Sequence, residues 1–262
     1  MTEITAQFRS DYAQHRAAEG RGYSGKALRA LPYLRSGAFA RQWEVRARSF
    51  DAFVKHVLVP MTGDRPLDVL DLGAGNGWLC HRIARMGHKA VAVDIRDDDV
   101  DGLGAAAEFL VDAPNLFECI TASFDALPFA SHRCDIALFN ASLHYAQDLR
   151  QVLAEAVRVT RPGGMLVILD SPFYTRDSDG AAMVAEKQAQ GAARFGAHAD
   201  VLLSQNFIEY LTRKRLAAAS PGLVWSRRRV LYPLWYEMRP LLARLAGART
   251  PSRFDLWTAR AP

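Results

Sequence analysis

The 262-residue sequence has little cysteine and no long apolar run, and both absences narrow the classes of protein that it can encode. Its three cysteines, Cys80, Cys119 and Cys134, are scattered and fit neither a disulfide framework nor a metal-binding spacing. No apolar run approaches the roughly 18 residues that cross a bilayer. The polar residues 1–20 do not resemble a secretory signal. We therefore expect reduced thiols and a cytoplasmic protein.

Internal repeats and low-complexity segments are also absent, and half of the residues are apolar, so the chain can bury a large core. The charge is uneven along the chain. Residues 67–170 contain eight Lys and Arg against fifteen Asp and Glu, whereas residues 171–262 contain fourteen against seven. The simplest interpretation is that the basic residues lie on solvated faces of the protein. The alternative is that they contact a polyanion or a membrane surface.

Short apolar runs alternate with helical patterns through the middle of the chain. Five such runs predict strands, at 67–72, 89–94, 116–122, 134–140 and 165–170. Strands that alternate with helices pair in parallel through right-handed crossovers and carry helices on both faces. Ligands bind such sheets beyond the carboxyl ends of the strands. The predicted strand ends do carry polar residues, which include Asp71, Asp94, Asp125, Asn140 and Asp170.

The flanking parts of the chain give weaker patterns. A helix is predicted over 41–59, and residues 1–40 form a lead-in with little periodicity. Beyond residue 170, the spacing of apolar residues predicts helices over 180–195, 201–220 and 233–248 and strands over 223–232 and 254–260.

A glycine-rich turn, Gly73-Ala74-Gly75-Asn76-Gly77, follows the first predicted strand. No lysine follows it, so it is not a nucleoside triphosphate loop. Its third glycine comes one position too early for the dinucleotide fingerprint. Asp71 just before the turn would repel a pyrophosphate but suits an amino group. The turn therefore indicates a ligand with an amino-acid end.

Two further strand ends carry carboxylates that complete a nucleoside site. Asp94, at the end of the second predicted strand, can accept hydrogen bonds from both hydroxyls of a ribose; the alternative is a cap for the residues after it. Asp125, next to Phe124, can accept from the exocyclic amine of a purine; the alternative is a local turn cap.

At this point the residues resemble a known family. The segments VLDLGAGNGWL, VAVD, FDALPF, CDIALFNASLHY and EAVRVTRPGGMLVIL occur in the order and spacing of class I S-adenosylmethionine-dependent methyltransferases. The chain is most similar to the type 11 group, which includes the ubiquinone and menaquinone C-methyltransferases, over residues 45–170. The resemblance implies a three-layer, Rossmann-like α/β fold with a seven-stranded, mostly parallel sheet whose last strand is antiparallel.

The resemblance also implies roles for individual residues. S-adenosylmethionine would leave the reaction as S-adenosylhomocysteine. Residues 71–77 would hold its methionine part, Asp94 its ribose and Asp125 its adenine, with Ile95 on the adenine face. The expected cofactor-binding residues are Asp71, Gly73, Ala74, Gly75, Asn76, Gly77, Asp94, Ile95, Phe124, Asp125, Ala126, Asn140 and Ala141. The expected layout is a lid in residues 1–40 and one methyltransferase domain over 41–262, with a cofactor-binding core at 66–170 and acceptor-side cap elements within 171–250.

The residues after the fourth predicted strand are candidates for the chemistry. His144 is the candidate base, because its unperturbed pKa lies near working pH; the alternative is that it packs or caps a helix. Tyr145 is a candidate aromatic wall. Asn140 is followed by Ala-Ser-Leu, which argues against adenine N6 or glutamine amide acceptors, and no metal-ligand spacing is present. Further candidates are Tyr12, Tyr23, Tyr33 and Trp43 for closing the site, with core packing favoured for Trp43, and Arg41 or Arg46 for the methionine carboxylate.

The aromatic and basic content of residues 171–250 favours a small apolar or aromatic acceptor. Three alternatives remain open: an RNA or protein acceptor, a nicotinamide-dependent oxidoreductase on a similar sheet, and a non-catalytic binder. Residues 227–246 could also contact a membrane surface. Nucleic acid is the weaker partner hypothesis, because no RNA-binding module is present.

Overall fold

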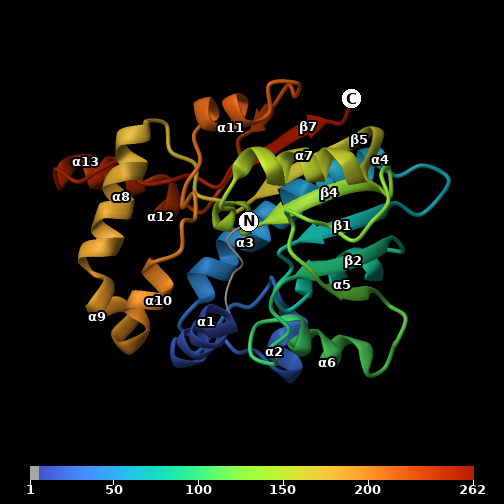
Figure 1. Cartoon of the computed structure of the whole chain (residues 1–262), viewed down its shortest axis with the longest axis horizontal. Coiled ribbons are helices and arrows are strands. Elements are labelled where there is room, and N and C mark those ends of the chain that lie inside the picture. Colours follow the sequence, from blue (N-terminus) through green and yellow to red (C-terminus); the bar gives the residue numbers. More distant parts are fainter. Residues whose placement is uncertain (1–5) are drawn as a thin grey trace.

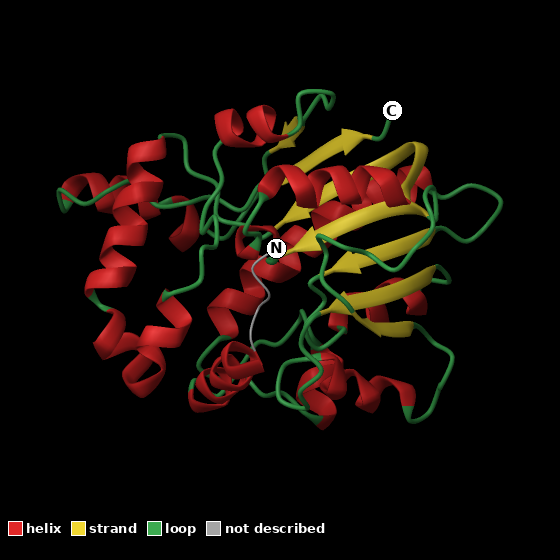
Figure 2. Ribbon diagram, in the orientation of Figure 1, coloured by secondary structure: helices red, strands yellow, loops and turns green. Residues whose placement is uncertain are grey.

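A seven-stranded sheet forms the centre of the computed structural model, which describes residues 6–262 of the chain (Figures 1 and 2). The strand order is β3-β2-β1-β4-β5-β7-β6, and β7 is antiparallel to both of its neighbours. This arrangement confirms the predicted fold class. The strands are β1 (Asp68–Leu72), β2 (Lys89–Asp94), β3 (Glu118–Thr121), β4 (Cys134–Asn140), β5 (Thr160–Leu169), β6 (Ser226–Arg228) and β7 (Leu256–Arg260).

Alternate residues of the central strands pack into two separate cores, one on each face of the sheet. Val69 of β1 faces a cluster with α3 (Ala40–Phe53) and α5 (Trp78–Arg85). Its neighbour Leu70 faces a cluster with α7 (Leu149–Val159) and α11 (Arg213–Ala219). Because both faces are covered, the central strands are apolar runs, and polar side chains are left to the strand ends.

The helix α3 continues through a π-helical turn, η1 (Val54–Leu58), into α4 (Val59–Met61), in agreement with the helix predicted over 41–59. The lead-in contains two helices, α1 (Ala6–Ala18) and α2 (Gly25–Ala30). Short helices η2 (Leu103–Ala106), α6 (Ala107–Leu110) and η3 (Leu143–Tyr145) connect the strands. Within the described range, no helix is both long and apolar enough to cross a membrane.

Strand β5 begins at Thr160, five residues before the predicted start at residue 165. The segment Arg161-Pro-Gly-Gly indicates a turn in the sequence, but Thr160 pairs with Cys134, and a register shift accommodates the extra residues before Met165 pairs with Ile136. The strand predicted over 223–232 is reduced to the three residues of β6.

The prediction of one helix over residues 201–220 is wrong. The chain forms α10 (Ala199–Leu203), leaves the helical conformation, and becomes helical again only in α11. Between them, the amides of Ile208 and Glu209 donate to the carbonyl oxygens of Ala146 (2.8 Å) and His144 (3.0 Å). Glu209 has a φ of 62°, which a helix does not accept. Bonds to the loop after β4 therefore outweigh the local helical pattern.

Two other predicted helices are divided into shorter ones. Residues 180–195 fall in α8 (Asp177–Ala189) and α9 (Gly191–Phe195), followed by η4 (Gly196–His198). Residues 233–248 form α12 (Leu234–Glu237) and α13 (Arg239–Leu245), with Pro240 in the first turn of α13. Figure 1 shows α8, α9 and α10 on the side toward which the parallel strands point, with α1 next to them.

Candidate functional site

A cavity of about 400 Å³ lies at the carboxyl ends of the parallel strands, where the predicted polar residues meet. It is within the range of small-molecule sites. The lining residues from the strand ends and the loops after them are Gly73, Ala74, Gly75, Asn76, Asp94, Ile95, Arg96, Asp101, Thr121, Ala122, Ser123, Phe124, Asp125, Asn140, Ala141, Ser142 and Tyr145. Most of the predicted cofactor-binding residues therefore share one cavity. Asp71, Gly77, Ala126 and His144 do not line it.

The glycine turn lies directly against neighbouring backbone. Gly73 has a φ of 83°, and its amide donates to the carbonyl oxygen of Val93 at 2.7 Å. A Cβ atom on Gly73 would lie 2.4 Å from the Cβ of Ser142. Gly77 precedes α5, so the first amides of that helix lie at the end of the turn, where the Trp78 amide donates to Asn76 Oδ1 at 3.3 Å. Only glycine satisfies both the backbone angle and the close contact at position 73.

Asp94 joins the glycine turn to the end of β2. Its Oδ2 accepts from the amide of Gly75 at 2.7 Å, and its Oδ1 accepts from the amide of Arg96 at 2.9 Å. Each carboxylate oxygen can accept more than one hydrogen bond. The carboxylate is thus fixed in orientation and retains acceptor capacity toward the cavity. Asp94 does not cap a helix, since the next helix, η2, starts at Leu103.

The loop after β3 forms another part of the cavity wall. Phe124 packs edge-on against Phe139, with ring centroids 6.0 Å apart. Gln151 of α7 donates to the carbonyl oxygen of Asp125 at 3.2 Å. The Oδ1 atom of Asp125 is buried and has no hydrogen-bond partner among the described residues. A buried carboxylate oxygen without a partner indicates a place for a ligand's donor.

Asp71 lies behind the glycine turn and is fully buried. Its Oδ2 is 3.9 Å from the Cys80 thiol, and its Oδ1 has no hydrogen-bond partner in residues 6–262. Burial, and then the charge of Asp94, raise the pKa of Asp71 to about 8. At neutral pH, this carboxyl is therefore largely protonated.

Stability should fall with rising pH because of Asp71. Its pKa is higher in the folded protein than the 3.8 of the unfolded chain, so its stabilising effect is complete below pH 4 and is lost as the pH rises toward 8. The slope for one proton approaches ~1.4 kcal/mol per pH unit. We expect Asp71→Asn to remove this slope from urea unfolding curves measured at pH 5, 6, 7 and 8. The exposed Asp64→Asn is the matched control, and an unchanged slope in Asp71→Asn contradicts the assignment.

Helix α1 covers the cavity and is held there by polar contacts. The hydroxyl groups of Tyr12 and Tyr145 are 2.9 Å apart. Arg16 forms an ion pair with Asp101, with an Nε–Oδ2 distance of 2.8 Å, and Asn76 also donates to Asp101. Phe8, Tyr12, Arg16, Tyr23, Trp43 and Phe207 line this side of the cavity. Of the other predicted closing residues, Tyr33 does not line it and instead donates to Asp51.

The two candidate arginines of α3 lie in different places. Arg46 lines the cavity, with its guanidinium 5.0 Å from the ring centroid of Trp43, and has no hydrogen bond or ion pair in the described part of the chain. Burial lowers its pKa, and the charge of Asp170 opposes this effect. Arg41 does not line the cavity and lies over the ring of Trp235.

His144 lies next to the cavity rather than in its wall. Its ring packs against that of Tyr145 in a tilted arrangement, with centroids 4.3 Å apart and 36° between the planes, and its Nδ1 has no partner among residues 6–262. Burial, helped by the charges of Lys187 and Arg46, lowers its pKa to about 3. Lys187 of α8 forms an ion pair of 2.6 Å with Glu209, whose amide bonds to the His144 carbonyl oxygen. His144 is therefore a neutral imidazole at neutral pH.

Sequence reasoning missed several residues around the cavity, above all Arg16, Asp101 and the Lys187–Glu209 pair. Their partners are far away in the chain, so no local pattern reveals them. Within the described residues, no group of three or more His, Cys, Asp or Glu side chains could hold a metal ion.

Comparison with known proteins now identifies the central part of the chain. Residues 70–168 match the family model described as a methyltransferase domain of type 11. Residues 70–168 therefore belong to a class I, S-adenosylmethionine-dependent methyltransferase domain of the type 11 group. S-adenosylmethionine is the cofactor of this domain, and the family match gives no support to the nicotinamide alternative.

Curated relatives match the methyltransferase domain over part of their length. The chain is 32% identical over 112 residues to the tRNA 5-carboxymethoxyuridine methyltransferase of Escherichia coli (strain K12), covering 43% of this chain and 42% of that protein. It is 33% identical over 105 residues to the malonyl-[acyl-carrier protein] O-methyltransferase of Hahella chejuensis, covering 39% of this chain and 36% of that protein. The chain thus spans less than half of the length of these two relatives.

The fold as a whole is shared with solved methyltransferase structures. The geranyl diphosphate C-methyltransferase of Streptomyces coelicolor A3(2), crystallised with Mg²⁺, geranyl diphosphate and S-adenosyl-L-homocysteine, has a TM-score of 0.61 at 15% identity. The comparison covers 99% of this chain and all of that chain. The elements outside residues 70–168 therefore also share the fold of that structure.

Proposed function

We propose that this protein transfers the methyl group of S-adenosylmethionine to a small, apolar or aromatic molecule. The observation that carries the proposal is one cavity lined by the glycine turn, Asp94 and Asp125 and covered by the aromatic residues of α1. In the reaction, a nucleophilic atom of the acceptor forms a bond to the methyl carbon. The carbon–sulfur bond breaks, and its electron pair stays on sulfur to give S-adenosylhomocysteine.

The donor would lie along the carboxyl edge of β1, β2 and β3. Asp94 accepts from the ribose hydroxyls through the capacity that its two backbone bonds leave free. Asp125 accepts from the adenine amine, with Ile95 and Phe124 against the ring. Asn140 and Ala141 line the same cavity from β4, whereas Ala126 and Gly77 would act by holding the backbone of their loops.

Each charged group of the donor's methionine part would be bound by a side chain of opposite charge. Arg46 faces the cavity with no competing hydrogen bond in residues 6–262, which suits the carboxylate of the donor. Asp71 lies behind the turn, where the donor's ammonium group would lower its pKa and favour its charged form. Donor binding at pH 7 would then release a proton from Asp71.

The arginine assignment predicts a large difference between two neighbouring substitutions. Arg46→Met should weaken S-adenosylhomocysteine binding by about 10- to 100-fold, because a hydrogen bond to a charged group contributes ~1.5–3 kcal/mol. Arg41→Met makes the same charge change on the same helix but outside the cavity, so its affinity should match the wild type. Titration calorimetry of both variants measures this, and equal affinities in all three proteins refute the assignment.

The acceptor would lie between Tyr145, Tyr12 and Phe207, which present aromatic surfaces to the cavity. An aromatic enclosure covered by α1 favours a small apolar molecule over the splayed base of an RNA. We accordingly propose that residues 1–40 act as the lid, 66–170 as the cofactor-binding core and elements within 171–250 as the acceptor-side cap.

Catalysis would rest mainly on alignment and exclusion of water, because the sulfonium carries its own activation. The candidate base, His144, is a weak base at neutral pH with a pKa of about 3. We propose that it supports the ring of Tyr145, against which it packs at a tilt. His144→Asn should then change the KM for the acceptor and leave the pH profile of kcat nearly unchanged. A base role instead predicts loss of kcat with an altered pH profile.

The acceptor class can be tested directly. Radioactive methyl transfer should be measured from labelled S-adenosylmethionine to a panel of small aromatic and apolar molecules, to unmodified tRNA and to an acylated carrier protein. The last two represent the substrates named for the two curated relatives. Transfer to a small molecule alone is expected, whereas transfer to tRNA or the carrier protein alone overturns the small-molecule proposal.

A further inference from the structure

Aliphatic side chains are concentrated on the outside of the segment that contains α12 and α13. We name five of them the leucine patch; their exposed fractions range from 49% to 78%. The leucine patch consists of Leu231, Leu234, Leu241, Leu242 and Leu245. Met238 is also exposed between them. A concentration of exposed apolar side chains of this kind indicates a binding surface.

Buried tyrosines fix the outward direction of these leucines. Tyr232 and Tyr236 are buried in the core, whereas Leu231 and Leu234 beside them are 78% and 77% exposed. The hydroxyl of Tyr232 is 2.8 Å from that of Ser49, and the hydroxyl of Tyr236 accepts from the Phe254 amide at 3.2 Å. The leucines cannot turn inward unless these anchored tyrosines leave the core.

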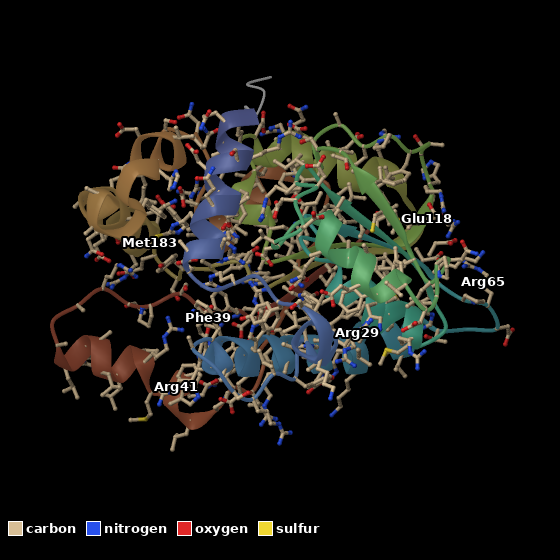
Figure 3. All side chains as sticks on the ribbon, turned by 90° about the horizontal axis from the view of Figure 1, so that it is seen from below. Arg29, Phe39, Arg41, Arg65, Glu118 and Met183 are labelled. Carbon is tan, nitrogen blue, oxygen red and sulfur yellow. The ribbon has the colours of Figure 1, made fainter. Side chains whose placement is uncertain are left out.

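Helix α13 continues the same surface. It contains no buried residue, and Leu241, Leu242 and Leu245 are spaced so that they share one helix face. Figures 1 and 3 both show α13 projecting from the body of the protein; in Figure 3 it lies at the lower left, near the labelled Arg41. The patch is therefore convex, and it is formed by a projecting helix rather than by a groove.

The charge around the leucine patch is strongly positive. Residues 227–246 contain five arginines and one acidic residue, Glu237. Glu237 is already paired with Arg229 at 2.6 Å and with Arg253 at 3.0 Å. Arg228, Arg239 and Arg244 have no ion pair in the described range, and Arg228 and Arg244 are exposed. The surface thus combines leucines with uncompensated positive charge.

We propose that the leucine patch and its arginines bind the surface of an anionic membrane. A convex helix with leucines on one face and arginines beside them can insert its apolar side chains between lipids while the arginines contact anionic headgroups. A second copy of the chain fits less well, because a two-fold contact would bring the arginines of both copies together. This inference goes beyond the proposed function and does not depend on it.

Sedimentation of the full chain with vesicles tests the inference. One vesicle set contains phosphatidylcholine and phosphatidylglycerol at three to one, and the other contains phosphatidylcholine alone. The protein should bind the anionic vesicles at low salt and dissociate as salt rises. The triple variant Leu241→Ser/Leu242→Ser/Leu245→Ser should reduce the partition coefficient at least tenfold. Arg228→Gln and Arg244→Gln should each reduce it about fivefold.

A matched control replaces exposed apolar residues elsewhere. The double variant Met86→Ser/Val111→Ser changes two exposed side chains outside the patch and should bind vesicles like the wild type, with circular dichroism confirming that all variants are folded. Three results overturn the inference: no binding of the wild type to anionic vesicles, equal binding by the patch variant, or a wild-type dimer in sedimentation velocity that the patch substitutions dissociate.

Discussion

Asp94→Ala should weaken binding of S-adenosylmethionine and S-adenosylhomocysteine by at least an order of magnitude. The substitution removes the acceptor proposed for the ribose hydroxyls, and each hydrogen bond to a charged group contributes ~1.5–3 kcal/mol. It also removes the acceptor for the amides of Gly75 and Arg96, which hold the glycine turn in place. Both effects act on the same ligand, so this is one of the two largest effects that we expect.

Titration calorimetry with S-adenosylhomocysteine measures the effect, and two variants separate its causes. Asp94→Asn keeps the size of the side chain and one acceptor oxygen, so its affinity should lie between those of the wild type and Asp94→Ala. Asp97→Ala removes an exposed carboxylate three residues away and should leave affinity unchanged. An unaltered affinity in Asp94→Ala would show that this carboxylate does not hold the donor.

Gly73→Ala should destabilise the fold by ~2–5 kcal/mol. Part of this cost arises because a Cβ at a φ of 83° is strained, by ~1–2 kcal/mol. The rest arises from overlap, since the new Cβ would lie 2.4 Å from that of Ser142, and overpacking costs ~1–3 kcal/mol. Relief of the overlap would have to move the glycine turn away from the loop after β4, which would also disturb donor binding.

A matched glycine separates backbone strain from overlap. Gly37 has a φ of 89°, but a Cβ there would meet no atom within 4 Å. Gly37→Ala should therefore show the strain alone, about 1–2 kcal/mol in urea unfolding. If Gly73→Ala lowers the free energy of unfolding no more than Gly37→Ala does, the glycine turn does not pack closely against Ser142.

The positions of the parallel strands could be predicted because their signals are local. A strand buried on both faces is a short apolar run, and its carboxyl end is marked by a polar residue such as Asp94 or Asn140. The glycine turn is also a local signal, and its spacing predicted the kind of cofactor that the family match supports.

Long-range pairing explains where the predictions failed. The segment around Glu209 has a helical pattern, but its backbone bonds to His144 and Ala146, more than sixty residues away, and these bonds prevent a helix. Thr160 extends β5 only because Cys134 lies beside it. Local composition carries no information about either partner.

The cavity wall was predictable only in part. The sequence places Asp71 and Asp94 at adjacent strand ends, yet Asp94 lines the cavity and Asp71 is buried behind the turn. That difference depends on the backbone path of Gly73 to Gly77. The cover formed by Arg16 and Asp101 joins residues 85 positions apart, which no spacing in one sequence can indicate.

The measurement that tests the central claim most directly is titration of the folded wild-type chain with S-adenosylhomocysteine, with Asp94→Ala measured beside it. We predict one binding site per chain in the wild type, release of a proton at pH 7, and an affinity at least tenfold lower in the variant. A folded wild-type protein that gives no binding heat at any temperature tested, and no thermal stabilisation by the ligand, would contradict the account.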